Sequence, residues 1–542
     1  MTRTAFRISL TLSVTVPLAW PTQAQTGSRL WRQDERVLVT DMSLVEAVAA
    51  DENVLYVVSP AGIGVYDRRF GRWQPPVTVL DGYVHAHVLS ALVDPTDQSV
   101  WLGTVAGVVN YSPRMRLYQT AAVSDGAAQL MFDRDDAFSG IYLRNRLGWH
   151  FLPRGGVIAR PVASLPPAHR QVRTASVQEV VSRHPEIETM RLGPLLDERM
   201  RSYRYTSAAE VAIAGEVFLG TNGRGVIRYD TGIATFELLP FGLLAPRASS
   251  VTVVPDGVWV GSDGRSGRSG FTWVSSDLQR FEFEEGPRIA GFAMGTVHQV
   301  TLHQGDLWAA TEAGVTIASP GSSQRLTTVQ GLPSDRALSL AGGPDGIWVG
   351  TQRGLAFVGN DGVARRVGTR LFEPVRALAR DGDSVWVGSR AGLGLSWTGA
   401  DRVVVPPDVV QVPELAREIV ALTLSDSVLV AGLRDRLVWR VVVAGNRAPT
   451  DDSPVPIAGG WQVERPIPEI GELTSLAADG DAVWIGGSRG FAHYRPATRS
   501  FVFHAAPGDV PGVVWDVAVD ERYLWLATEG GLVRIEKRAV VP

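Results

Sequence analysis

Histidine is the residue type in this sequence that most readily binds a metal ion or transfers a proton near neutral pH. His85 and His87 form its closest pair, and on an extended chain side chains two residues apart face the same side. A metal site needs further ligands, but no carboxylate lies at a matching spacing, and His298 and His303 are spaced wrongly to share one face of a strand. We therefore interpret the histidines as structural or solvent-facing, and we expect neither a metal site nor a cofactor.

Other common catalytic patterns do not stand out. Glycine-rich turns such as 264–267 lack the strand-to-helix context and the Lys-Ser/Thr pair of a phosphate-binding loop, and there is no Gly-x-Ser-x-Gly stretch with acidic and histidine partners. Aspartates such as Asp345, Asp381 and Asp479 lie in turns, where carboxylates accept backbone hydrogen bonds. A carboxylate pair for glycan hydrolysis needs only spatial closeness and stays open, but we expect no catalytic residues.

Composition limits the classes of partner. The 542 residues carry a net charge of −4 and no cysteine. The near-neutral balance gives no general attraction to nucleic acid, and the lack of cysteine excludes disulfides and cysteine metal sites.

The N-terminus has the three parts of a secretory signal peptide. Arg3 and Arg7 precede an apolar stretch over residues 8–20, and Thr22 and Ala24 are small residues at the usual positions before a cleavage point. We predict a signal peptide over residues 1–24, cleavage after Ala24, and a periplasmic or secreted protein. No later apolar run is long enough to span a membrane.

One short motif recurs along nearly the whole chain. It is a strand with a central anchor residue, as in Ile347-Trp348-Val349-Gly350-Thr351, followed by a glycine and a second strand, as in Gly354-Leu355-Ala356-Phe357. The eleven anchors are Tyr56, Trp101, Tyr142, Phe218, Trp259, Trp308, Trp348, Trp386, Leu429, Trp484 and Trp525. Most are 38 to 49 residues apart, and three or four short strands per repeat, separated by Gly, Pro and Asp turns, are typical of propeller blades.

Burial favours a ring of such sheets. A single small sheet cannot bury both of its faces, whereas sheets stacked around an axis bury them and leave few exposed edges. The sequence therefore predicts an all-β fold, a β-propeller of about eleven blades with the anchor tryptophans wedged between adjacent blades. One propeller holds about four to eight blades, so we expect two rings.

Two long intervals suggest where the rings divide. One contains residues 160 to 205, where Ser176 and Glu179 fit a helix-capping box, and the other is a Pro/Asp/Gly-rich loop over 443 to 460. An outer-strand-like piece at residues 30–32 could complete the last blade and close a ring from both ends of the chain. The predicted partition is an outer propeller of blades 1–3 and 10–11 (25–160 and 455–542), an inner propeller of blades 4–9 (206–450), and a partly helical insertion at 161–205. Serial rings of 5+6 or 4+7 blades and one large ring remain alternatives.

The repeat at 331–358 resembles the two-component regulator propeller repeat. The resemblance rests on Gly331-Leu332-Pro333, Asp345-Gly346, Trp348-Val349-Gly350-Thr351, Gly354-Leu355 and Phe357, and looser copies extend it over residues 45–536. In that family such repeats form the extracytoplasmic sensing region of hybrid two-component systems, often recognising carbohydrate. The sequence reaches Pro542 without a membrane helix, kinase core or DNA-binding segment after the last repeat, so we expect a stand-alone recognition module.

The loop face of the rings is the best candidate for a binding site. The loop before the first strand of each repeat and the turn after its Trp-Val-Gly-Thr stretch should emerge on the same side. Arginine there suits planar anionic or hydroxyl-rich ligands, although surface arginine is also common in this sequence. The predicted binding residues are Arg247, His298, Arg336, Arg353, Arg390, Arg417, Arg489 and His87.

The leading hypothesis is an exported β-propeller that binds a carbohydrate or peptide ligand, or an envelope protein partner, and catalyses no reaction. One alternative is an extracytoplasmic propeller enzyme such as a lyase or glycan hydrolase, which a cluster of His, Tyr and acidic side chains at one ring mouth would favour. Another is a purely structural module of an envelope complex, which a broad apolar patch would favour.

Overall fold

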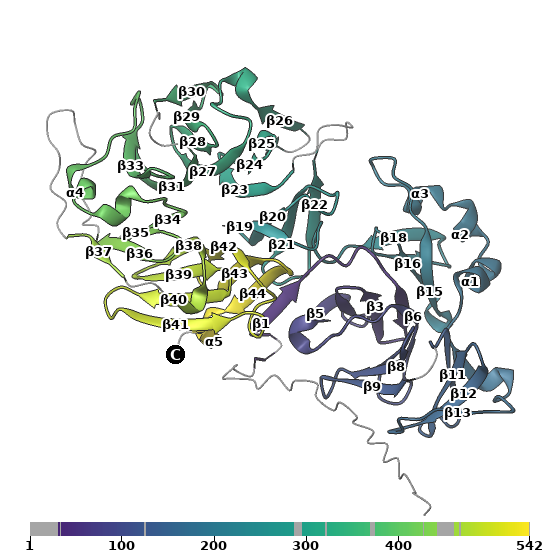
Figure 1. Cartoon of the computed structure of the whole chain (residues 1–542). Helices are drawn as coiled ribbons and strands as arrows, with labels where there is room; N and C mark the ends of the chain where they lie inside the picture. Colours follow the sequence, from purple (N-terminus) through teal and green to yellow (C-terminus); the bar gives the residue numbers. More distant parts are fainter. Residues whose placement is uncertain are drawn as a thin grey trace, which may run out of the picture.

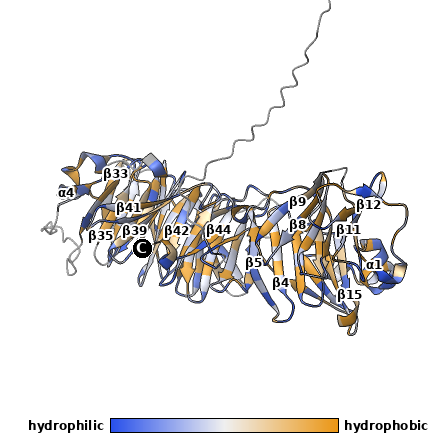
Figure 2. Cartoon of the chain, turned by 90° about the horizontal axis from the view of Figure 1, so that it is seen from below, coloured by the Kyte–Doolittle hydropathy of each residue, from blue (hydrophilic) through white to orange (hydrophobic). Residues whose placement is uncertain are grey.

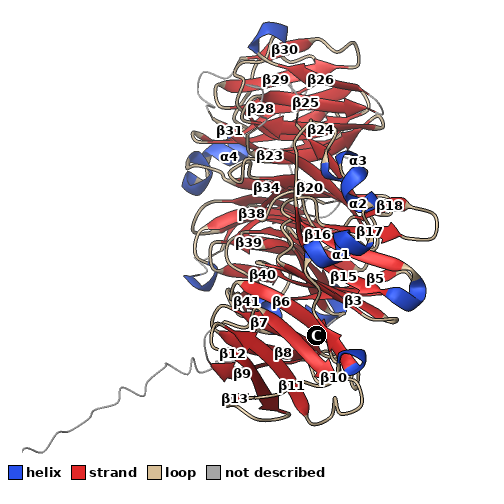
Figure 3. Cartoon of the chain, turned by 90° about the vertical axis from the view of Figure 1, so that its right-hand side faces the viewer, coloured by secondary structure: helices blue, strands red, loops and turns tan. Residues whose placement is uncertain are grey.

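The computed structural model describes residues 31–32, 34–123, 126–286, 295–319, 322–368, 374–425, 428–441, 460–464 and 468–540. These residues form eleven antiparallel sheets of three to five strands and a few short helices (Figure 3), which confirms the predicted all-β propeller class. The predicted signal peptide and its cleavage point lie outside the described residues. Within those residues, no helix is both long and apolar enough to cross a membrane.

The anchor residues lie in the second strand of each sheet, as the repeat predicts, and most are buried. Trp348 in β28 (Gly346–Thr351) is 2% exposed and packs with Leu355 of its own repeat and with Val375 and Val387, in the first two strands of the next. Among the seven anchor tryptophans only Trp259 is half-buried. The wedge interpretation is therefore confirmed for six of them.

Four sheets form one part of the molecule, the four-bladed unit, whose innermost strands neighbour each other in the order β15, β2, β6, β10 (Figure 1, right). Its sheets are β2 (Ala47–Ala50), β3 (Val54–Ser59), β4 (Gly62–Asp67), β5 (Arg72–Thr78); β6 (Val88–Val93), β7 (Val100–Thr104), β8 (Gly107–Ser112), β9 (Leu117–Val123); β10 (Gln129–Asp133), β11 (Gly140–Asn145), β12 (Gly148–Pro153), β13 (Arg160–Pro161), β14 (Gln171–Arg173); and β15 (Tyr205–Val211), β16 (Glu216–Thr221), β17 (Val226–Asp230), β18 (Thr235–Leu239).

Seven sheets form a closed ring, the seven-bladed ring, in which β19 touches both β23 and β42 (Figure 1, left). Its sheets are β19 (Ala248–Val254), β20 (Gly257–Ser262), β21 (Gly270–Ser275), β22 (Phe281–Glu285); β23 (Val297–His303), β24 (Asp306–Thr311), β25 (Gly314–Ser319), β26 (Ser322–Leu326); β27 (Ala337–Gly343), β28, β29 (Gly354–Gly359), β30 (Ala364–Val367); β31 (Val375–Asp381), β32 (Ser384–Ser389), β33 (Gly392–Trp397); β34 (Ala421–Leu424), β35 (Val428–Gly432), β36 (Leu437–Val441), β37 (Gln462–Val463); β38 (Leu473–Asp479), β39 (Ala482–Gly487), β40 (Gly490–Arg495), β41 (Ser500–Ala505); and β42 (Val514–Val519), β43 (Tyr523–Thr528), β44 (Gly531–Glu536), completed by β1 (Arg36–Val39).

Helices are short and peripheral. The predicted insertion contains α1 (Val177–Arg183), α2 (Glu186–Thr189) and α3 (Leu192–Leu195), and the predicted capping box forms, with Ser176 and Glu179 each accepting the other's backbone N–H. The remaining helical segments are α4 (Pro407–Val410), α5 (Lys537–Val540), and the 3-10 turns η1 (Val79–Asp81), η2 (Ala168–Arg170), η3 (Ala212–Ala214), η4 (Thr328–Gln330), η5 (Pro413–Ala416) and η6 (Pro468–Ile470).

The last blade is completed by the first strand, as predicted, but with different residues. In Figure 1 the purple strand β1 lies beside the yellow strand β44, and Val37, Leu38 and Val39 pair with Arg534, Val533 and Leu532. In the predicted outer strand at residues 30–32, the described residues 31 and 32 do not do this, and residue 30 lies outside the described ranges. Trp31 instead donates its indole N–H to Asp509 (2.8 Å) on the loop after β41, and the more apolar β1 enters the core.

The observed grouping of blades differs from the predicted partition. Blades 1 to 4 form the four-bladed unit, which is inserted between β1 and β19 of a ring made by blades 5 to 11. The prediction placed the crossings at the two long intervals. The long interval around 160–205 is an insertion within the four-bladed unit, and the interval over 443–460 lies largely outside the described residues. The chain actually crosses at 40–46 and 240–247, where the anchor spacing is ordinary.

The two crossing segments hold each other and bring the two parts side by side in an elongated molecule (Figure 2). Leu243 N donates to Thr40 O (3.0 Å), and Asp41 forms a β-bridge with Gly242. Beside them, Trp73 of the four-bladed unit exchanges two 2.9 Å backbone hydrogen bonds with the Gln279 side chain of the ring.

Replacing a core residue of the closing strand should destabilise the ring. Leu38→Ala removes a side chain that is 4% exposed, and we expect it to lower the free energy of unfolding by about 2–5 kcal/mol. Leu117→Ala, at a position that is 41% exposed, serves as the control and should cost less than about 1 kcal/mol. Urea denaturation followed by tryptophan fluorescence measures both, and equal effects would contradict the closure argument.

Candidate functional site

The two kinds of loop named in the sequence prediction lie together at one end of the seven-bladed ring, which we call the mouth. In five blades the first residue after the second strand donates its backbone N–H to the loop before the innermost strand: Gln352 to Arg336 (2.9 Å), Arg390 to Pro374 (3.3 Å), Glu312 to Thr296 (3.3 Å), Ser488 to Glu472 (2.9 Å) and Glu529 to Val513 (3.0 Å). This confirms that these loops emerge on the same side. The mouth is therefore built from one loop and one turn per blade.

The hydroxyl that ends the Trp-Val-Gly-Thr stretch shapes each turn. Thr351 Oγ1 donates to Gly354 O (2.8 Å) and accepts Arg353 N–H (3.2 Å). Thr311, Ser389 and Thr528 make the equivalent bond to the glycine three residues later. The motif thus holds the turn and presents the intervening residue, such as Arg353, to solvent.

Most innermost strands of the ring contain a β-bulge near their start. The bulge leaves one residue per blade out of the pairing and changes the direction of its side chain. The pairing register skips the second residue of β19, β23, β27, β31, β38 and β42. The skipped residues are Ser249, His298, Leu338, Arg376, Thr474 and Trp515. Ser249 and Thr474 tie their blade to the next by donating to Val297 O (2.7 Å) and Val514 O (2.5 Å). The other four, His298, Leu338, Arg376 and Trp515, have larger side chains and do not make this backbone hydrogen bond.

Several predicted binding residues take part in ion pairs that join neighbouring blades. Arg247 contacts Glu529 of the last blade (3.1 Å). His298 Nε2 lies 3.0 Å from Glu312 Oε1, and Arg336 of the next blade approaches the same oxygen at 2.9 Å. Part of the predicted charge at the mouth therefore holds blades together.

A second run of charges continues around the mouth. Arg376 contacts Glu418 (2.9 Å), and Arg434 bridges Glu418 (3.2 Å) and Glu472 (3.0 Å). The predicted Arg417 pairs with Asp435 (3.2 Å). These pairs are partly exposed, and such pairs contribute little stability individually.

Three predicted arginines are different. Arg353, Arg390 and Arg489 are exposed on the post-anchor turns of three blades, and their guanidinium groups contact no acidic partner among the described residues. The eighth predicted residue, His87, belongs to the four-bladed unit, where it and His85 contact Glu46 Oε1 at 2.7 and 3.3 Å. The structure thus brings seven of the predicted residues to the mouth and separates His87 from them.

Sequence reasoning missed Trp515, Arg376 and the acids Glu312, Glu418 and Glu529. Trp515 is 43% exposed, which is unusual for tryptophan in this fold, and the bulge of β42 puts it at the mouth. Their positions in the repeat could have identified Arg376 and Trp515, because each follows the first apolar residue of an innermost strand.

The electrostatics of the mouth keep His298 neutral at neutral pH. Burial lowers the pKa of His298, and the nearby Arg336 and Arg376 lower it further, although Glu312 opposes the shift. Within the described residues, no three histidine or acidic side chains are placed to hold a metal ion.

Asp516 follows the bulge at the seam between the last and first blades of the ring. Its Oδ2 accepts the backbone N–H of Val251 in the neighbouring blade (2.9 Å). Desolvation raises the pKa of the half-buried Asp516 to about 7, even though the N–H groups of Val251 and Val517 favour the carboxylate.

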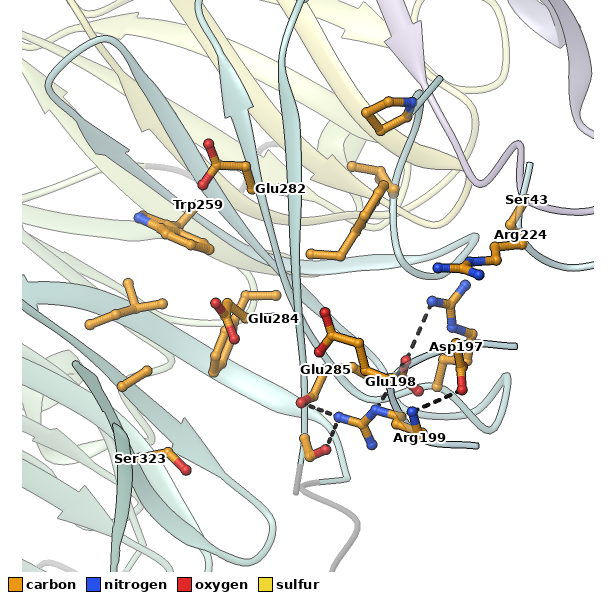
Figure 4. A pocket seen from close by; sticks show the side chains of 18 of the residues that line it. Ser43, Asp197, Glu198, Arg199, Arg224, Trp259, Glu282, Glu284, Glu285 and Ser323 are labelled. Atoms are coloured by element: carbon orange, nitrogen blue, oxygen red, sulfur yellow. Dashed lines mark hydrogen bonds and ion pairs between the residues drawn. The ribbon is translucent and has the colours of Figure 1, made fainter. Parts of the chain in front are cut away.

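A separate cleft of about 1080 Å³ lies where the two parts of the molecule meet (Figure 4). One wall is the outermost strand β22 with Trp259 and side chains of the following blade, and the other comes from the helical insertion and Arg224. Arg224 Nη1 donates to Pro194 O (2.7 Å) and Leu196 O (2.8 Å), at the end of α3.

On the right-hand side of this cleft in Figure 4, arginines and carboxylates form a cluster of ion pairs. Arg201 makes a two-pronged contact with Glu285 (2.8 and 2.7 Å) and also contacts Asp197 (2.6 Å). Burial raises the pKa of Glu285, but Arg201, Arg268 and Arg199 outweigh it and the net shift is downward. The pKa of Asp197 falls to about 2 through its hydrogen bonds to Arg201 and Tyr203, against a desolvation that raises it. This cluster joins the insertion to the ring.

No family model matches the chain, and no curated protein sequence matches it. Solved structures that resemble it include an extracellular domain of a putative hybrid two-component system from B. thetaiotaomicron (16% identity, 90% of this chain and 60% of that chain, TM-score 0.40). Others are virginiamycin B lyase from Staphylococcus aureus (14%, 53% and 94%, 0.42) and PorZ, a surface component of the type-IX secretion system of Porphyromonas gingivalis (10%, 93% and 87%, 0.33). The chain spans about 60% of the length of the first. At these identities the likeness concerns the fold alone.

The raised pKa of Asp516 predicts a specific pH dependence of stability. The native carboxyl keeps its proton up to about pH 7, whereas the unfolded one loses it near pH 4. The native state therefore binds more protons between these values, and this group's contribution falls as pH rises, by about 1.4 kcal/mol for each unit of raised pKa. Asp516→Asn keeps an acceptor for Val251 N–H and should remove this loss.

Urea denaturation at pH 5 and pH 8 measures the effect, with the exposed Asp481→Asn as control. Asp516→Asn should gain stability relative to the wild type at pH 8 and gain less at pH 5. An identical pH dependence in both proteins would contradict the assignment.

Proposed function

We propose that this protein is an exported β-propeller of the two-component regulator propeller repeat type, which binds an acidic, hydroxyl-rich ligand at the mouth of its seven-bladed ring and catalyses no reaction. The location outside the cytoplasm rests on the signal-peptide pattern over residues 1–24. An acidic carbohydrate is the ligand class that the mouth fits best, and an envelope protein presenting such groups is the partner class.

The observation that carries the proposal is the set of exposed, acid-free arginines Arg353, Arg390 and Arg489. Other mouth arginines, such as Arg336 and Arg417, contact carboxylates of a neighbouring blade or of their own, whereas these three have charge and donors available for a ligand. A planar guanidinium binds a carboxylate through two parallel hydrogen bonds. Trp515 adds an exposed aromatic surface at the same end of the ring.

Binding of a defined acidic glycan tests the proposal. Isothermal titration at low salt should show binding of tetragalacturonic acid and none of the neutral maltotetraose. Arg353→Ala/Arg390→Ala removes two charge-assisted contacts and should weaken binding by about 10-fold or more per arginine. Arg495→Ala, an exposed arginine at the opposite end of β40 from the mouth, is the matched control and should bind normally. Equal affinity for both glycans, or an unaffected double variant, would contradict the proposal.

A second candidate is a propeller lyase, and the His298–Glu312 pair favours it. His298 is neutral at neutral pH, so it can accept a proton, and Glu312 holds its ring. Beside arginines that bind the carboxylate of an acidic sugar, such a base removes the proton on the carbon next to that carboxylate. The glycosidic C–O bond on the adjacent carbon breaks as the double bond forms, and the departing sugar oxygen takes up a proton from solvent. Ultraviolet absorbance would detect the unsaturated product of tetragalacturonic acid. Turnover that His298→Ala abolishes and Arg495→Ala preserves would establish this candidate in place of the binding-only function.

A further inference from the structure

The outermost strand β22 offers an edge inside the cleft that is free at Phe283, while Arg199 donates to the outward carbonyl of Glu285 at its end. Among the described strands β22 pairs with β21 alone, and Gly286 N donates to Ser269 O (2.7 Å) while Ser275 N donates to Arg280 O (3.0 Å). Hydrogen-bonded pairs alternate along an antiparallel ladder. The backbone of Phe283 therefore points away from β21, and its N–H and C=O have no partner among the described residues.

The side chains on either side of Phe283 give this edge a charge. Glu282 and Glu284 are exposed, share one face of β22, and contact no cation within the described ranges. Figure 4 shows them on the side of Trp259, away from the cluster of Arg199 and Glu285. The arginines of the cleft are directed to Glu285, Asp197 and backbone carbonyls, so they do not neutralise this face.

Trp259 packs beside the core cluster of Phe271 and Val297 and exposes part of its surface to the cleft. In three other blades the anchor indole N–H donates to an aspartate near the end of the innermost strand: Trp101 to Asp94 (3.1 Å), Trp484 to Asp479 (3.1 Å) and Trp525 to Asp520 (2.7 Å). In this blade Val254 ends the innermost strand, and the indole N–H of Trp259 has no partner in the described part of the chain. Trp259 is also the half-buried member of the set and lines the cleft.

We propose that this cleft binds an extended basic peptide as an additional strand beside β22. A free strand edge recognises a peptide through its backbone, and alternate side chains supply specificity. The residue opposite Phe283 faces the same side as Phe283, which is 38% exposed, and its two neighbours face the side of Glu282 and Glu284. The recognised pattern is therefore basic–apolar–basic. The cleft volume of about 1080 Å³ is at the upper end of the range of about 300–1,000 Å³ for ligand sites.

Fluorescence polarisation with the full chain and a labelled Lys-Val-Lys-Val-Lys-Val peptide tests this inference. A peptide of the same composition without alternation, Lys-Lys-Lys-Val-Val-Val, should bind several-fold more weakly. Methylating the central backbone nitrogens should weaken binding by roughly tenfold, because strand hydrogen bonds are lost. Glu282→Gln/Glu284→Gln should weaken binding by about tenfold or more and flatten its salt dependence, whereas the exposed Glu469→Gln, in η6 before β38, should not.

Other outcomes separate this site from the mouth. Arg353→Ala/Arg390→Ala should leave peptide binding unchanged, and the glutamate double variant should leave binding of tetragalacturonic acid unchanged. A glucosamine tetramer that binds as tightly as the peptide would overturn strand addition in favour of simple charge recognition. No binding of the alternating peptide at low salt, or equal binding by the wild type and the glutamate double variant, would overturn the proposal entirely.

Discussion

Close contact between neighbouring sheets is the constraint on which the rest of this protein depends. The glycine of the Trp-Val-Gly-Thr stretch lies where the next blade's innermost strand begins: a Cβ atom on Gly350 would lie 2.7 Å from Val375 Cγ1, and one on Gly261 would lie 2.7 Å from Val297 Cγ1. Such distances are too short for any side chain. The motif therefore marks the line of contact between two neighbouring blades, which we call a seam. The tryptophan of the motif fills the space between the two sheets.

The close contacts between blades leave the ends of the sheets as the places where residue type differs from repeat to repeat. Within a blade, backbone pairing and apolar contacts determine most positions of the inner strands, and charge gathers on the loops, on the bulges at the mouth and on outer strands such as β22. At the mouth it has two roles. Arginines that reach a carboxylate of the next blade join the blades, and those on turns without such a carboxylate remain available to a ligand. The same residue type at equivalent repeat positions thus differs in role according to its neighbour.

The insertion of one propeller into another creates a second kind of surface. Because the chain leaves the ring after β1 and returns before β19, the four-bladed unit stands against the outer edge of the first ring blade. The Arg201–Glu285 contact and the Gln279–Trp73 exchange hold that position. The outer strand β22 consequently forms the wall of a cleft, and Glu282 and Glu284 have no cationic partner among the residues that the structure describes.

The sequence by itself determined the propeller class, the placement of anchors such as Trp348 in second strands, the capping box at Ser176, and the side on which the mouth loops emerge. Each of these follows from local periodicity or turn chemistry, which residues close in sequence specify. Only the tertiary structure decided which blades share a ring. The contact surfaces between blades are alike, so the sequence does not say which blades are neighbours, and the spacing of anchors does not mark the crossings at 40–46 and 240–247. It also decided which arginines are free, since the partners of Arg247 and Arg336 lie on other blades, and it placed Trp515 at the mouth through a bulge that strand periodicity does not reveal.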